Sequence, residues 1–131
     1  DVCLEAEKSP TAKVSHHRLH ENFEGIDETI ALSSMYAANH LGARVVATLT
    51  QTGKTALWMS RISSNIAIFA MSDNYKTLKK VTIYRGVYPC YIDKTSADDW
   101  NDVNSHVIEN LEDRAEVTNG DIVIVTKGMH A

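Results

Sequence analysis

The sequence predicts an α/β fold of three layers, in which a mostly parallel sheet of about four strands, in the order 3-2-1-4, lies between helices. The first observation is that short, β-branched apolar runs alternate with segments whose apolar residues have helical spacing. The second is that this pair of patterns occurs four times in the order αβαβαβαβ. Such alternation implies parallel strands joined by right-handed crossovers. At 131 residues the chain is long enough for one domain with a single core.

The first helix is predicted after a polar, aperiodic segment. Residues 1–25 contain only a short VCLEAEK run and are interpreted as a linker, so the domain is expected over residues 26–131. The stretch DETIALSSMYAANHL (27–41) has apolar or small residues at helical spacing. Asp27 is a suitable N-cap and Gly42 a suitable stop.

The remaining elements follow in order. The apolar runs RVVATLT (44–50), IAIFAM (66–71), VYPCYI (87–92) and DIVIVTKG (121–128) predict four strands. Helices are predicted over residues 55–62, over 75–84 after a cap at Asp73 or Asn74, and over about 98–117. Pro89 places the third strand at an edge of the sheet, and the first strand is expected at its centre.

Composition excludes several classes of function. A formal net charge of −4 argues against nucleic acid or an anionic membrane as the main partner. No apolar run approaches the length of a transmembrane helix. Cys3 and Cys90 are far apart and suggest neither a disulfide framework nor a metal site, so we expect reduced thiols in a cytoplasmic protein.

The turn TQTGK, after the first predicted strand, carries the strongest candidate site. In a parallel sheet, ligands bind beyond the carboxyl ends of the strands, where the strand order reverses. A helix start offers unpaired N–H groups and partial positive charge, glycine permits close approach, and hydroxyls and an amine add donors. The predicted anion-binding residues are Thr50, Gln51, Thr52, Gly53, Lys54 and Thr55.

The residues of this turn allow two other interpretations. It could be a well-capped loop without a ligand. Gly53-Lys54-Thr55 also matches the end of a nucleotide-binding P-loop, but that motif needs a glycine where Thr48 stands.

The histidine-rich SHHRLHE (15–21) has HxxH spacing but no evident third ligand, so no metal site is predicted.

Taken together, these segments resemble a known family. DETIALSSMYAANHL, TLTQTGKTALWMSRISSNIAIFAMS, YRGVYP and GDIVIVTKG resemble the C-terminal domain of pyruvate kinase, in the family's order over nearly the whole chain. MYAANHL, SRISS and IFAMS look most like the bacterial isozyme activated by AMP and sugar monophosphates. VCLEAEK resembles the segment that leaves the family's catalytic barrel.

The resemblance implies a regulatory role. In the family, phosphoryl transfer from phosphoenolpyruvate to ADP takes place in the barrel, which also holds Mg²⁺ and K⁺, so this fragment is expected to be inactive and free of cofactors. The C-terminal domain binds an allosteric effector and forms one interface of a homotetramer, and the loop matching residues 50–55 holds an effector phosphate. Alternatives are a purely structural assembly module and a free-standing sugar-phosphate sensor.

Two departures from the family pattern sharpen this expectation. Members activated by fructose 1,6-bisphosphate clamp the second phosphate with a Trp and a following Arg. Trp100 matches the Trp approximately, but NDVNSHVIEN (101–110) has no Arg or Lys and offers only His106. We therefore expect a monophosphate effector.

The second departure is at the end of the chain. The family continues with a serine-, glycine- and threonine-rich loop and a fifth, antiparallel strand, whereas this sequence ends at Ala131. A truncated domain is therefore expected, with residues 122–126 as an apolar edge that tends to pair with a second copy.

Overall fold

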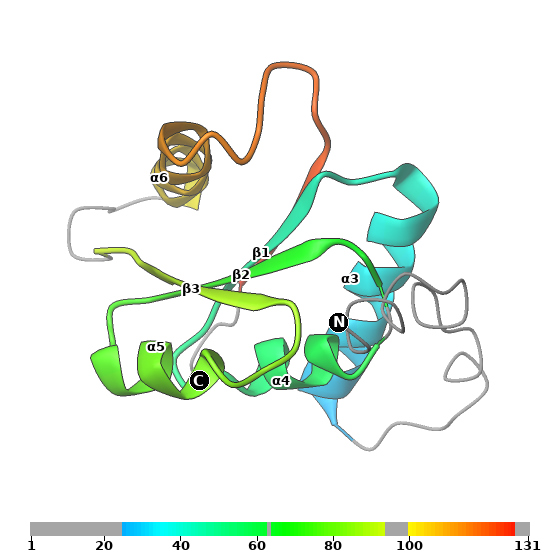
Figure 1. Ribbon diagram of the computed structural model, residues 1–131, viewed down its shortest axis with the longest axis vertical. Coiled ribbons are helices and arrows are strands. Elements are labelled where there is room, and N and C mark those ends of the chain that lie inside the picture. Colours follow the sequence, from blue (N-terminus) through cyan, green and yellow to red (C-terminus); the bar gives the residue numbers. More distant parts are fainter. Residues whose placement is uncertain (1–24, 63, 94–99, 128–131) are drawn as a thin grey trace, which may run out of the picture.

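In the computed structural model the described residues are 25–62, 64–93 and 100–127, and they form an α/β fold with alternating helices and strands (Figure 1). The predicted fold class is confirmed. Its elements are α3 (Ile26–Leu41), β1 (Val45–Leu49), α4 (Lys54–Ser60), β2 (Ala67–Ser72), α5 (Tyr75–Val81), β3 (Val87–Tyr91), α6 (Trp100–Asp113) and β4 (Val123–Lys127).

The sheet has the order β3-β2-β1-β4, and all its pairings are parallel. This confirms the predicted order and the central position of β1. Every residue of β1 is buried, as expected for a strand with neighbours on both sides and helices on both faces. Thr48 of β1 lies opposite Ala70 of β2 and Thr126 of β4.

The helices cover both faces of the sheet (Figure 1). On one face α3, α4 and α5 contribute Met35, Met59 and Val81 to the core, together with the inward residues of the strands. On the other face Val107 and Leu111 of α6 pack against β1, β2 and β3. Burial of these apolar side chains on two faces is what holds the three layers together.

The start of α3 differs from the prediction. The helix begins at Ile26 with Gly25 as the N-cap and no side-chain cap, so Asp27 is not the N-cap but lies in the first turn. There its carboxylate faces α4 instead of its own helix end, as described below. Gly42 ends the helix in the left-handed conformation, as predicted, and the Ala43 N–H donates to the Ala38 carbonyl at 3.0 Å.

Three helices end earlier than predicted, and the smallest difference is at α4, which ends at Ser60 instead of residue 62. The predicted end of α6 near Val117 is wrong, because Ala115 adopts a positive φ of 57° and the Glu116 N–H turns back to the Leu111 carbonyl. The helix α5 ends at Val81 instead of residue 84, because β-branched residues follow Val81. The Tyr84 N–H then donates to the Val81 carbonyl in a tighter turn.

The two edge strands of the described sheet are β3 and β4. The edge position predicted from Pro89 is therefore confirmed. Whether β4 pairs with a second copy stays a prediction, as does the linker assigned to residues 1–25, of which 1–24 lie outside the described residues. No described helix combines the length and the hydropathy that crossing a membrane requires.

Candidate functional site

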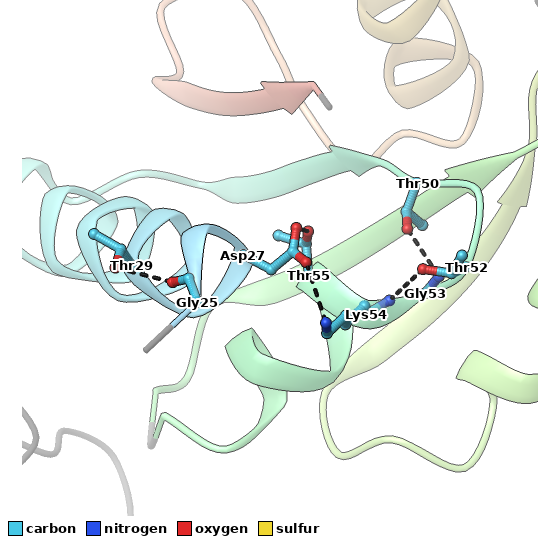
Figure 2. Close-up of polar contacts among 8 residues, drawn as sticks. All are labelled: Gly25, Asp27, Thr29, Thr50, Thr52, Gly53, Lys54 and Thr55. Atoms are coloured by element: carbon cyan, nitrogen blue, oxygen red, sulfur yellow. Dashed lines mark hydrogen bonds and ion pairs between the residues drawn. The ribbon is translucent and has the colours of Figure 1, made fainter. Parts of the chain in front are cut away.

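The turn between β1 and α4 lies at the carboxyl end of the central strand, as predicted (Figure 1). Its first residue, Thr50, is buried, and its N–H donates to the Met71 carbonyl of β2 at 3.0 Å. The Thr50 Oγ1 accepts a hydrogen bond of 2.8 Å from the Gly53 N–H, which closes the turn (Figure 2). The turn is thus fixed to the sheet at its start and shaped by its own hydroxyl.

Gly53 is the N-cap of α4 and has a φ of 81°, a conformation that favours glycine. A Cβ at this position would stand 2.9 Å from the Val81 Cγ1 and 3.5 Å from the Thr77 Cγ2, both on α5. Glycine is therefore required here by the backbone and by the close packing of α5, whether or not a ligand binds.

The polar side chains that follow reach toward α3 (Figure 2). The Lys54 N–H lies 3.4 Å from the Thr52 Oγ1. The Lys54 Nζ lies 3.7 Å from the Asp27 Oδ2, and the Thr55 Oγ1 donates to the Asp27 Oδ1 at 3.4 Å. This places one carboxylate beside two of the predicted anion-binding residues.

The helix α5 adds two residues that the sequence did not single out. The Thr77 hydroxyl donates to the Gln51 carbonyl, and the Lys80 Nζ donates to the Thr52 carbonyl at 3.3 Å. Thr77 and Lys80 are three residues apart and share a face of α5. That spacing was visible in the sequence, but nothing in it indicated that this face meets the turn.

The chemistry of the turn suits the binding of an anion. Two ammonium groups, those of Lys54 and Lys80, lie at the turn. Among the described residues, the N–H groups of Thr52 and Thr55 have no protein acceptor. Within the same residues no group of three or more potential metal ligands was found.

Of the other two predicted contacts, the structure describes the side chain of His106 alone, and it does not lie at the turn. His106 lies on α6, which packs on the face of the sheet opposite α4, and its Nδ1 is 3.8 Å from the Glu109 Oε2. The backbone of Trp100 begins α6, but its side chain is outside the part of the chain that the structure describes. A role for either residue stays a prediction.

Two groups with shifted pKa values lie elsewhere. Burial raises the pKa of the Cys90 thiol, and the neighbouring Arg114 guanidinium opposes that shift. The pKa of the Tyr91 phenol is raised, first by loss of water and then by the Asp93 carboxylate. Neither group belongs to residues 50–55.

Two cavities of the described chain lie at the other end of the strands. One of about 360 Å³ is lined by residues that include Ser60, Asn65 and Arg85, and one of about 400 Å³ by residues that include Asn39 and Arg44. Neither is lined by residues 50–55. The candidacy of the turn therefore rests on its donors and charges.

A comparison with known families identifies the domain. The model of the family described as "Pyruvate kinase, alpha/beta domain" matches residues 28–131, which is most of the chain. The chain belongs to this family. The resemblance to the C-terminal domain of pyruvate kinase is therefore confirmed.

Curated relatives of the pyruvate kinase domain agree. The chain is 48% identical over 128 residues to pyruvate kinase II of Salmonella typhimurium, and 44% identical over 128 residues to the pyruvate kinase of Haemophilus influenzae. Each alignment covers 97% of this chain but 26% of the relative. The chain therefore spans about a quarter of the length of these relatives, and its likeness to bacterial pyruvate kinases is confirmed.

Proposed function

We propose that this chain is the regulatory C-terminal domain of a pyruvate kinase and binds a phosphorylated allosteric effector at residues 50–55. One observation carries the proposal. At the carboxyl end of the central strand, α4 begins without a side-chain cap, between two lysines and several threonine hydroxyls. A helix start of this kind favours an anion, and a phosphate can accept hydrogen bonds from several donors at once.

The proposed ligand is a monophosphate such as AMP, ribose 5-phosphate or glucose 6-phosphate. A second phosphate would need its own fixed cation, and residues 101–110 contain no Arg or Lys. Lys80 does not change this expectation, because its amine contacts the Thr52 carbonyl and so stands beside the same turn as Lys54. Both cations would serve one phosphate.

The activity of the whole protein is part of the proposal. We infer that the parent is a cytoplasmic pyruvate kinase that transfers phosphoryl from phosphoenolpyruvate to ADP in a separate barrel, with Mg²⁺ and K⁺. The domain would contact its own barrel and contribute to a homotetramer. Effector binding would bias that assembly, so effector and substrate affinities would be coupled reciprocally.

A second candidate function is a structural assembly module without an effector. It is favoured by the hydrogen bonds that the turn makes with itself and with α5, since Thr50, Thr52 and Thr77 all have partners within the domain. A free-standing sugar-phosphate sensor is a third possibility. Phosphate binding at residues 50–55 separates the assembly module from the other two functions, and a catalytic barrel in the parent protein separates the regulatory domain from the free-standing sensor.

The test is an NMR titration of this chain with ribose 5-phosphate and, in parallel, fructose 1,6-bisphosphate. We expect saturable shifts at residues 51–55, with no gain in affinity from the second phosphate. Lys54→Met should weaken binding because it removes a cation at the turn. Lys76→Met is the matched control, since Lys76 lies in the first turn of α5 and is exposed.

The outcomes separate the candidates. Equal losses in the two lysine variants would indicate a general effect of charge and no site at the turn. Shifts in neither titration would leave the assembly module as the better account of this chain. Tighter binding of the bisphosphate would contradict the proposed ligand class.

A further inference from the structure

The Asp27 carboxylate already occupies the side-chain donors that the proposed phosphate would use. One of its oxygens accepts from the Thr55 hydroxyl at 3.4 Å, and the other lies 3.7 Å from the Lys54 Nζ (Figure 2). Asp27 comes from α3, 28 residues away in sequence from Thr55, so this contact joins two separate elements. A carboxylate at these donors stands where a phosphate oxygen would be expected.

We propose that Asp27 is an internal competitor for the effector phosphate, and that effector binding displaces its carboxylate from Lys54 and Thr55. The inference rests on the proposed function and adds to it a regulatory contact at the same site. The displacement follows from simple chemistry. A threonine hydroxyl has one hydrogen to donate, so Thr55 can serve either the carboxylate or the phosphate.

Electrostatics favours the same exchange. Lys54 has three donors and could in principle contact both anions, but a phosphate dianion next to the Asp27 carboxylate would be repelled by it. The side chains of Lys54 and Asp27 are 63% and 44% exposed, so their ion pair is weak and easily broken. A doubly charged phosphate that also accepts hydrogen bonds from backbone N–H groups would replace the Asp27 carboxylate in this ion pair.

The displaced carboxylate has a second favourable position. Asp27 lies in the first turn of α3, whose N-cap Gly25 provides no side-chain acceptor. A carboxylate freed from Lys54 can interact with the N–H groups at the start of its own helix, where negative charge is stabilising. The exchange would therefore change contacts at the start of α3, a helix whose Ala31 and Met35 pack in the same core as α4.

The experiment compares three variants of this chain by NMR titration with ribose 5-phosphate and with inorganic phosphate at neutral pH. Asp27→Asn removes the charge, and Asp27→Ala also removes the acceptor. Glu28→Gln is the matched control, because it removes the same charge from the same helical turn. Within the described chain the hydrogen bond and the ion pair to Thr55 and Lys54 come from Asp27, not from Glu28. Dispersed spectra establish that each variant is folded.

We expect Asp27→Asn to bind ribose 5-phosphate about threefold to fivefold more tightly than the unchanged chain, the range expected for an exposed ion pair. Asp27→Ala should bind at least as tightly as Asp27→Asn, and Glu28→Gln should bind almost as the unchanged chain does. On titration of the unchanged chain, the amide of Asp27 should shift together with that of Thr55.

The failure of this inference differs from the failure of the proposed function. If every variant binds but Asp27→Asn is no tighter than Glu28→Gln, Asp27 is not a competitor, and the phosphate site stands. If Asp27→Asn binds more weakly, Asp27 positions Lys54 for the ligand, and the inference is overturned. If neither the unchanged chain nor any variant binds either probe, the proposed function fails and the inference with it.

Discussion

The turn from β1 to α4 and the turn from β2 to α5 both carry the chain from a parallel strand into a helix of seven residues. They lie side by side at the carboxyl ends of the two neighbouring strands (Figure 1). In the second turn the Ser72 Oγ accepts from the Asn74 N–H at 3.1 Å, and the Asn74 Oδ1 accepts from the Lys76 N–H at 3.0 Å. This is an ordinary side-chain cap.

The first turn lacks such a cap. Its N-cap is Gly53 in the left-handed conformation. The Thr50 Oγ1 accepts from the N–H of Gly53 itself and so closes the turn instead of capping α4. The sequence could cap a short helix with asparagine and does so at α5. At α4 the N-cap has no side chain, the Thr52 Oγ1 lies at the longer distance of 3.4 Å from the Lys54 N–H, and two lysines stand at the turn. This difference supports the proposed anion site.

The largest expected effect is at Gly53. Gly53→Ala should destabilise the domain by about 2–4 kcal/mol, because a left-handed backbone costs about 1–2 kcal/mol for a residue with a Cβ and the clash adds to it. The clash is specific, since the new Cβ would meet the Val81 Cγ1 at 2.9 Å. Urea denaturation followed by circular dichroism measures the loss.

Gly42→Ala is the control for the backbone term. Gly42 has a φ of 66°, and a Cβ there would meet nothing within 4 Å. Gly42→Ala should therefore lower the stability of the domain by about 1 kcal/mol, from the strained backbone alone. Equal losses at the two glycines would mean that α5 moves away to accept the new methyl group, and that the first turn is less rigid than its contacts indicate.

The features that the sequence predicted are those that local chemistry decides. Alternating periodicity predicted the order of the elements, and Gly42 predicted a helix end. Asp73 or Asn74 was the predicted cap of α5, and the cap is Asn74. The end of α6 was not predicted, because Ala115 adopts a positive φ, which is uncommon for alanine and cannot be foreseen from the residue type.

The candidate site was predicted only in part. Residues 50–55 were evident, because hydroxyls, glycine and lysine are adjacent in sequence at a strand end. Asp27, Thr77 and Lys80 were not, because their contact with the turn depends on how α3 and α5 pack. Asp27 was moreover assigned to the N-cap of its own helix, where its residue type is common.

An intermediate effect is expected at the carboxyl end of β1, where Thr48 in the strand and Thr50 just after it differ in their hydroxyl partners. Thr50→Val should cost about 1–2 kcal/mol, because it leaves the Gly53 N–H without its acceptor in a buried turn. Thr48→Val should be neutral or stabilise the domain by up to about 1 kcal/mol, because the buried Thr48 hydroxyl has no partner among the described residues.

Urea denaturation of the two valine variants checks this pair. The substitution is the same and both side chains are buried, so the two variants compare the loss of a hydroxyl in similar surroundings. A loss at Thr48 as large as that at Thr50 would indicate that the Thr48 hydroxyl has a partner, such as a water shared with Thr126, whose hydroxyl is also buried and unpaired within the described chain.

The smallest expected effect is at the capped turn. Asn74→Ala should cost about 1 kcal/mol, the usual value of an N-cap, and Asn74→Asp should retain most of that stability because its carboxylate can accept from the Lys76 N–H. Neither variant should change the affinity for ribose 5-phosphate, because this turn serves only to start α5. If Asn74→Ala weakened binding as much as Lys54→Met, the two turns would not be separable. The helix start at α5 would then support the ligand indirectly, through the contacts of Thr77 and Lys80 with the first turn.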